Sequence, residues 1–270
     1  MSALTTTPDA PSLPLARSPL AAWHVQHGAR FDEIDSWQVP AVYTDENSEA
    51  TAARTGLAIA DISFTTKMML RGPGVAELAK ALTGGSGAVE PGAVAPLMGD
   101  KSALACRLQV DQLLVLAGPT GKDKVKQLLS TARGDEAEGE APGLTRWFPA
   151  KQLLEIDVTS AFAAFWIFGP HSDDLLRQIT HFDVAALGAG SQPAGESGRV
   201  SARSCAETGL AGVPTILVRP PSPAISSMRV LTGWDAAEYL WEELFRAGQE
   251  WKMAPLGLDG LDLLLTQASK

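Results

Sequence analysis

Two segments of this chain repeat one pattern, and the repeat constrains the fold more than any other feature does. Residues 68–84 read MMLRGPGVAELAKALTG, and residues 165–181 read FWIFGPHSDDLLRQITH. Each is an apolar, strand-like stretch followed by a Gly-Pro step and an amphipathic helical pattern. At an offset of 97 residues (169 − 72), the identical pairs are Gly72/Gly169, Pro73/Pro170, Leu78/Leu175 and Thr83/Thr180. The shared order indicates a duplicated unit, so we expect two similar lobes.

The segments around the repeat predict a mixture of helices and strands. Asp235 is expected to cap a helix at residues 236–247, and Gly248 to end it. Helices are also expected at residues 49–54 and 123–131, and strands at 104–108, 112–117, 153–158, 164–168, 199–205 and 215–219. This arrangement favours an α+β fold of two packed, pseudo-duplicated ferredoxin-like lobes.

Two segments suggest where the lobes begin and end. Residues 133–143 (RGDEAEGEAPG) are acidic and lie near the middle of the chain, so we predict lobes at residues 17–143 and 144–270. Residues 1–16 are rich in Thr, Pro and Ala and are predicted to be a mobile tail. The glycine-rich residues 188–198 are predicted to form a flexible loop.

Composition excludes several classes of protein. The 270 residues carry a net charge of −9, which disfavours binding to nucleic acid or to an anionic membrane surface. No apolar run is long enough to span a membrane, and no secretory signal is present, so we expect a cytoplasmic protein. Cys106 and Cys205 cannot build a disulfide scaffold or a four-ligand zinc site. The pair His24 and His27 lacks any accompanying metal motif, so surface or capping roles are expected and no metal site is predicted.

Few residues have the spacing that a catalytic site requires. Gly118–Lys122 resembles a phosphate-binding loop, but the spacing fails and Asp123 follows, so a strand-to-helix turn is the better interpretation. Residues 84–87 read as a helix end and loop, and Asp173 and Asp174 as acids at a helix start. Asp61 is expected to brace the end of a strand. Most of the seven tryptophans are expected in the core, with a few able to line a cavity for a flat ligand.

Several motifs resemble one family, the aminomethyltransferase (T-protein) of the glycine cleavage system. Residues 18–43 (SPLAAWHVQHGARFDEIDSWQVPAVY) resemble its opening T/S-P-L…H and G-W-x-x-P-x-x-Y elements. Asp61-Ile62-Ser63 is similar to its D-V-S segment, and the two Gly-Pro turns to its G-P turns. Residues 234–257, with Glu238-Tyr239-Leu240-Trp241, resemble a helix of the same family. The resemblance implies the pseudo-duplicated folate-binding fold, and it accounts for the repeat.

The departures from this family concern its site residues. Where the T-protein has L-T-N-D, with a catalytic Asp, this chain has Leu82-Thr83-Gly84-Gly85. In residues 207–218 the pterin-binding Glu of the R-T-G-Y-T-G-E-D-G-F-E-I segment is matched to Val213. Both arginines of the G-A-R-D-S-L-R element are matched to leucines, Leu261 and Leu265. The family's C-terminal β-barrel domain is not among these residues.

These departures lead to a function hypothesis and to alternatives. The chain is expected to have lost aminomethyltransferase catalysis and to act as a scaffold, or as a subunit of a C1- or amine-oxidising complex. The small (gamma) subunit of sarcosine oxidase is similar, so the expected partner is a flavin-dependent amine oxidoreductase. The apolar residues 261–265 could serve that contact or form the last core element. No catalytic residue is assigned and the cofactor-binding residues remain unassigned.

The main alternative is an active tetrahydrofolate-dependent aminomethyl or methyl transferase with a rebuilt pocket. Tetrahydrofolate is then the cofactor that the resemblance implies, and Asp61, Asp100 or Asp111 would replace the missing carboxylate. The iron–sulfur-assembly branch of the superfamily is disfavoured, because Arg203-Ser204-Cys205-Ala206-Glu207 does not match its K-G-C-x-x-G-Q-E motif.

Overall fold

The structure is a computed structural model, and it describes residues 15–85, 90–133, 145–148, 152–188, 203–221 and 225–268. Residues 1–14 of the expected tail, 134–143 of the acidic segment and 189–198 of the glycine-rich segment therefore lie outside the described residues. Ala16, the last residue of the expected tail, belongs to a strand.

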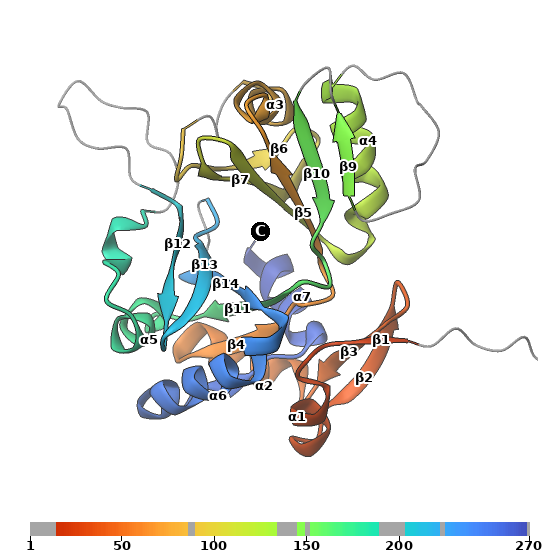
Figure 1. Ribbon diagram of the computed structural model, residues 1–270. Coiled ribbons are helices and arrows are strands. Elements are labelled where there is room, and N and C mark those ends of the chain that lie inside the picture. The colour runs from red at the N-terminus through yellow and green to blue at the C-terminus, as the bar shows by residue number, and fades with distance from the viewer. Residues whose placement is uncertain are drawn as a thin grey trace, which may run out of the picture.

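Two six-stranded sheets and one small sheet form the fold (Figure 1). The first sheet has the order β6 (Val94–Leu97), β7 (Asp100–Gln109), β8 (Gln112–Ala117), β5 (Thr66–Arg71), β10 (Leu153–Asp157) and β9 (Thr145–Phe148). The second has the order β12 (Cys205–Leu210), β13 (Val213–Val218), β14 (Ser227–Gly233), β11 (Phe162–Phe168), β4 (Ala58–Asp61) and β15 (Ala254–Pro255). The third comprises β1 (Ala16–Arg17), β3 (Trp37–Val42) and β2 (Arg30–Ile34).

Helices cover the outer face of each large sheet. The α-helices of the described residues are α1 (Ala21–Gln26), α2 (Glu46–Thr55), α3 (Val75–Leu82), α4 (Lys122–Arg133), α5 (Ser172–Ile179), α6 (Ala237–Ala247) and α7 (Leu258–Ala268). Helices α3 and α4 pack on the first sheet, and α5 and α6 on the second. A third hydrophobic cluster lies between the two sheets and includes Leu261 and Leu264 of α7. The layers are therefore helix, sheet, sheet and helix, with α7 entering between the sheets.

The two large sheets repeat one topology, which confirms the α+β, pseudo-duplicated ferredoxin-like fold. In each, a repeat strand (β5 or β11) is followed by a helix, three consecutive antiparallel strands and a second helix. Each sheet also takes a strand from the other half of the chain: β10 pairs with β5, and β4 pairs with β11. The two sheets therefore do not divide at residues 143 and 144, and the predicted lobes describe halves of the chain rather than separate sheets.

The Gly-Pro step of the repeat has a steric cause. Gly72 and Gly169 have φ values of +135° and +130°, which side-chain-bearing residues rarely adopt. A Cβ at Gly72 would lie 1.9 Å from the carbonyl oxygen of Gln152, and one at Gly169 would lie 2.1 Å from that of Gly56. Gln152 lies just before β10 and Gly56 just before β4, the two strands that join the sheet of the other half. Each repeat glycine therefore allows one of these strands to enter its sheet.

Two local predictions need correction, and one is confirmed. Asp235 does not cap α6: it lies in the short 3-10 helix η4 (Trp234–Ala236), Ala236 occupies the cap position, and no side chain bonds there. Gly248 ends α6 as predicted, and the chain continues into η5 (Gly248–Trp251). The strand expected at residues 199–205 begins only at Cys205, and residues 199–202 lie outside the described part.

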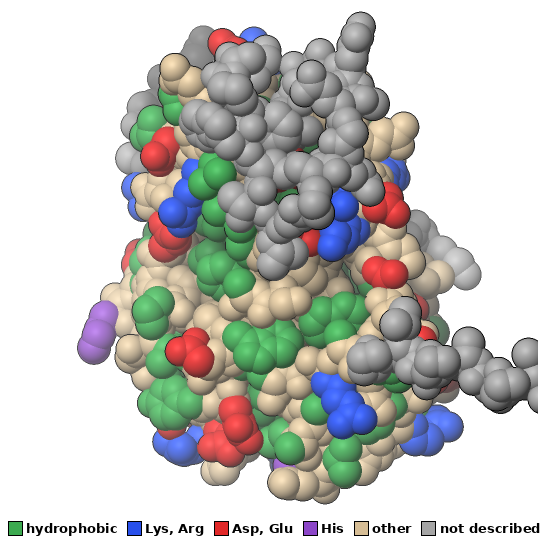
Figure 2. Space-filling model, turned by 45° about the vertical axis from the view of Figure 1, so that its right-hand side comes forward, with side chains coloured by type: hydrophobic (Ala, Val, Ile, Leu, Met, Phe, Trp, Pro, Cys, Tyr) green, Lys and Arg blue, Asp and Glu red, His purple; other side chains and the backbone are tan. Residues whose placement is uncertain are grey.

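Some apolar side chains remain at the surface. Val25, Met98, Val110 and Tyr239 are each about half exposed or more. Figure 2 shows hydrophobic side chains gathered across the middle of one face. Leu261 and Leu264 do not belong to such a surface, because both are buried, whereas Leu265 is 37% exposed. The core interpretation of residues 261–265 therefore holds for Leu261 and Leu264.

Candidate functional site

A cavity of about 550 Å³ lies between the two sheets and is the candidate functional site. Its walls come from both sheets, from the connection at residues 62–65 and from α7. Most lining side chains are apolar: Ile62, Phe64, Leu104, Trp166, Phe168, Pro220, Pro221, Ile225, Leu258, Leu261, Leu264 and Leu265. The polar and charged members are Thr65, Lys101, Ser102, Ser227, Arg229 and Asp262. Such a mainly apolar cavity with a few polar groups is typical of small-molecule sites.

Two neighbouring strands build the polar end of the cavity. Residues two apart on a strand share a face, so Trp166 and Phe168 of β11 both face the cavity, as do Ser227 and Arg229 of β14. The strand register places Trp166 opposite Arg229 and Phe168 opposite Ser227. As a result, the Arg229 guanidinium carbon lies 4.2 Å from the centre of the Trp166 ring, a cation–π contact.

The Arg229 side chain lacks a counter-charge in the described part of the chain. Its Nε is buried without a hydrogen-bond partner there, and so are Trp166 Nε1 and Ser227 Oγ. Burial lowers the pKa of Arg229 to about 10, and the nearby Cys106 thiol opposes that shift. The guanidinium therefore remains charged at neutral pH. Buried polar groups are usually hydrogen-bonded, so three unsatisfied donors in one cavity wall require an explanation.

Helix α7 supplies the opposite wall. Leu261 and Leu265, the positions matched to the family's arginines, both line the cavity. Asp262 between them is the one carboxylate among the described lining residues. Burial, and then the charge of Asp259, raise the pKa of Asp262. Asp262 was not among the carboxylates that the sequence singled out.

The structure does not bring the other proposed carboxylates into the cavity. Asp61 is buried elsewhere, Asp100 accepts a hydrogen bond from Ser102 and pairs with Lys124 at 3.0 Å, and Asp111 lies in the turn between β7 and β8. Val213 lines a separate surface hollow near the end of α5. The loss of a pterin acceptor therefore cannot be argued from Val213.

The remaining sequence candidates have structural roles. Gly118–Lys122 forms a strand-to-helix turn through η1 (Pro119–Gly121), as predicted. Asp173 pairs with Arg219 at 2.7 Å, and Asp174 with Arg177 at 2.8 Å. Gly84 and Gly85 follow the end of α3 with positive φ, and residues 86 and 87 lie outside the described part.

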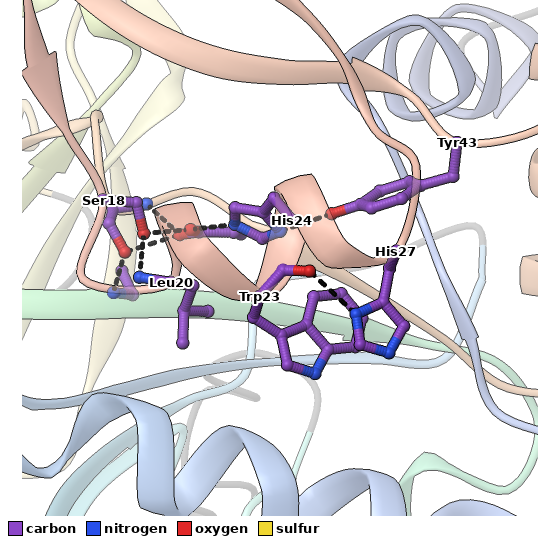
Figure 3. Close-up of polar contacts among 9 residues, drawn as sticks. Ser18, Leu20, Trp23, His24, His27 and Tyr43 are labelled. Atoms are coloured by element: carbon purple, nitrogen blue, oxygen red, sulfur yellow. Dashed lines mark hydrogen bonds and ion pairs between the residues drawn. The ribbon is translucent and has the colours of Figure 1, made fainter.

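The prediction that His24 lies at the surface is wrong. His24 is 1% exposed, and both ring nitrogens are used: Nε2 contacts Asp61 Oδ2 at 2.8 Å, and Nδ1 contacts the Tyr43 hydroxyl at 2.7 Å (Figure 3). Ser18 Oγ also donates to Asp61 Oδ2, and Ser63 donates to Oδ1. Burial alone would raise the pKa of Asp61. The hydrogen bonds from these neighbours outweigh burial and lower the pKa below its ordinary value, so the carboxyl is ionised.

This cluster is not a nucleophilic site. A serine–histidine–aspartate triad needs the histidine to contact the serine hydroxyl, whereas Ser18 and His24 both contact the same oxygen of Asp61. His27, which directly follows the same helix, stacks on Trp23 and is exposed, as expected for a surface histidine. The buried cluster fastens α1 and β3 to the end of β4, which agrees with the bracing role predicted for Asp61.

A buried lysine holds the connection between β4 and β5. Lys67 is fully buried, and its Nζ donates to the carbonyl oxygens of Ser63 at 2.9 Å and Thr65 at 2.7 Å. Burial lowers the pKa of Lys67 to about 7, although Asp61 and Asp157 oppose the shift. Lys67 does not line the cavity, so its effect is on the position of residues 62–65.

Among the described residues, no group of three His, Cys, Asp or Glu side chains could hold a metal ion. No helix in the described ranges is long and apolar enough to cross a membrane.

Sequence reasoning missed Arg229, although a signal was present. Strand β14 reads SMRVLTG, and a lone arginine in such an apolar strand is unusual, because buried strands rarely hold a charge without a partner. Its partner position could not be found from sequence, since the pairing with Trp166 depends on the register between β11 and β14.

Comparisons with known proteins agree with this geometry. The crystal structure of glycine cleavage system aminomethyltransferase T from Bartonella henselae matches with a TM-score of 0.68 at 16% identity, covering 95% of this chain and 63% of that one. A chain of heterotetrameric sarcosine oxidase from Corynebacterium sp. U-96, in complex with pyrrole 2-carboxylate, matches with a TM-score of 0.51 at 22% identity, covering 87% and 95%. The fold is thus the duplicated α+β fold of the aminomethyltransferases.

Sequence relatives place the chain in a family. The model of the GCVT N-terminal domain matches residues 20–268, and the chain belongs to this family. The aminomethyltransferases of Streptomyces coelicolor and Geobacillus thermodenitrificans are each 27% identical, over 261 and 256 residues. The chain spans 64% of the length of these two relatives. The resemblance expected from the sequence is confirmed.

Proposed function

We propose that this chain is a family member without aminomethyltransferase activity, which supports a flavin-dependent amine-oxidising partner as a subunit or scaffold. One observation carries the loss of activity: the cavity presents an unpaired cation, Arg229, where a pterin needs acceptors. The amide and amino edge of a pterin is rich in donors, and each buried donor left unpaired costs about 1–3 kcal/mol. Asp262 is the one carboxylate of the described lining, so the cavity offers few acceptors for this edge, and we infer that it binds tetrahydrofolate poorly.

The kind of partner is suggested by the second solved structure. The match covers 95% of a chain of heterotetrameric sarcosine oxidase, so the shared fold occurs in an amine-oxidising assembly. The hydrophobic side chains on the face in Figure 2 offer apolar area for such a contact.

Calorimetric titration with a reduced pterin tests the loss of activity. Two ligands are titrated separately, 6-methyltetrahydropterin and tetrahydrofolate, because only tetrahydrofolate carries glutamate carboxylates. We expect no heat from 6-methyltetrahydropterin at millimolar concentration. Micromolar binding of this pterin would contradict the proposal.

Co-expression tests the partnership. The chain is expressed with a flavin-dependent amine oxidoreductase from the same organism, and amine oxidation is measured with and without it. We expect a stable complex on gel filtration and higher activity or flavin retention in the complex. Separate elution together with unchanged activity would argue against the partnership.

Asp262 favours a second candidate function, tetrahydrofolate-dependent C1 transfer in a rebuilt pocket. Its carboxyl lines the cavity and its pKa is raised, as in groups that accept and return protons. If 6-methyltetrahydropterin binds, Asp262→Asn should weaken it at least tenfold, whereas the non-lining Asp259→Asn should not.

A further inference from the structure

We propose that the cavity between the sheets binds an organic monocarboxylate with an apolar, flat body, and that Arg229, Trp166 Nε1 and Ser227 Oγ hold its carboxylate. This goes beyond the proposed function, which concerns the absence of pterin chemistry and the presence of a partner. Neither of those tests depends on a carboxylate.

The first step of the argument is the charge of Arg229. A buried guanidinium is normally paired with an anion, because an isolated charge loses its hydration on burial. In the described part of the chain, Arg229 makes neither an ion pair nor a hydrogen bond, and its ring contact with Trp166 neutralises no charge. A bound anion would supply the missing counter-charge.

The second step is the set of donors around it. Trp166 Nε1 and Ser227 Oγ are buried and unpaired in the described part, and both residues share the cavity-facing side of the sheet with Arg229. Indole and guanidinium groups can only donate hydrogen bonds, so this wall requires an acceptor. A carboxylate has two acceptor oxygens and suits the fork of a guanidinium.

The third step is the rest of the cavity. Phe64, Leu104, Phe168, Leu261 and Leu264 make its walls apolar, which suits a hydrophobic or aromatic body. Lys101 is exposed, whereas Arg229 is partly buried and its Nε is fully buried, so Arg229 is the less exposed cation of the described lining. One buried cation matches one negative charge better than the two charges of a phosphate.

Two isosteric probes test this proposal on the intact chain. 1-Naphthoate carries a carboxylate, and 1-naphthamide replaces it with a neutral amide of the same shape. Binding is followed by calorimetry and by the indole ¹H–¹⁵N cross-peak of Trp166, which is identified from its absence in Trp166→Phe. We expect 1-naphthoate to bind at least tenfold more tightly than 1-naphthamide and to shift the Trp166 peak.

Variants of the cation complete the test. Arg229→Gln should weaken 1-naphthoate at least tenfold and leave 1-naphthamide unchanged, while Arg229→Lys should weaken 1-naphthoate less. Should Arg229→Gln fail to fold, Ser227→Ala serves instead, with an expected threefold loss or more. Equal affinities for the two probes, no binding of either, or full affinity for 1-naphthoate in the variants would overturn the proposal.

Discussion

His24 shows how one buried side chain can fasten three segments. Its ring joins Asp61 at the end of β4 to Tyr43 beyond β3, and it lies on α1. Burial and the nearby charges of Asp61 and Glu49 raise the pKa of Tyr43, so the phenol stays protonated and donates to His24. With Nε2–H donating to the carboxylate and Nδ1 accepting from the phenol, the imidazole ring satisfies both neighbours.

Replacing this histidine should therefore be costly. His24→Phe leaves the Asp61 carboxylate and the Tyr43 hydroxyl without a partner, and we expect a loss of about 3 kcal/mol in the free energy of unfolding. The matched control is His27→Phe, which keeps the stacking on Trp23 at an exposed position and should cost less than about 1 kcal/mol. Urea unfolding at pH 7 measures both, and equal losses would contradict the bracing role.

Lys67 should make stability depend on pH. Its pKa is about 7 in the folded chain, whereas a free lysine side chain has a pKa of 10.5. Between these values the unfolded chain binds a proton that the folded chain has released, so the free energy of unfolding should rise with pH from about 7 to 10. Lys67→Met removes this contribution.

The measurement is urea unfolding of both proteins at several pH values in that window. The wild-type free energy should rise relative to that of Lys67→Met, whose absolute stability is lower because two carbonyl groups lose their donor. Parallel pH profiles would show that Lys67 titrates as it does in the unfolded chain.

At the scale of elements, each copy of the repeat depends on a strand from the other half of the chain, which packs against its Gly-Pro turn. We predict that Gly169→Ala and Gly72→Ala each reduce the free energy of unfolding by roughly 3 kcal/mol, since the new Cβ meets a backbone carbonyl at 2.1 Å or 1.9 Å. Gly118→Ala is the control, because its φ is −60° and nothing lies within 4 Å of the added Cβ. It should change stability by less than about 1 kcal/mol. Thermal unfolding of the three variants measures this, and a mild effect at Gly169 would contradict the steric explanation.

The elements themselves were largely predictable from sequence. Alternating and amphipathic patterns located β7, β8, β11, α3 and α5 within a few residues. These patterns could not predict that β4 and β10 each join the sheet of the other half of the chain. Nothing in an apolar run of four or five residues specifies which sheet it enters. The same limit explains His24: its burial depends on Asp61 and Tyr43, which are distant in sequence. Leu261 and Leu265 were noticed through family comparison, whereas Arg229 needed the register of two strands.

For the whole molecule, the exchange predicts that the two halves cannot fold separately. Residues 1–143 lack β9 and β10, so the edge of β5 and one face of the first sheet would be exposed. We expect this fragment to be unfolded or aggregated by circular dichroism and NMR. Co-expression with residues 144–270 should restore a native spectrum, and an independently folded first fragment would contradict the prediction.

The exchanged strands also set the width of the cavity. The chain passes from one sheet to the other twice, at residues 62–65 and 158–161, through connections of equal length. From Asp61 to Thr66 a fully extended chain reaches at most about 18 Å, and packed sheets lie about 10 Å apart. The two connections thus act as a pair of tethers, which limit the separation of the strand ends that they join to at most about 18 Å. A molecule too thick for this gap is rejected by the length of the backbone, and enlarging the gap for a bulkier guest would require inserting residues into both tethers at once.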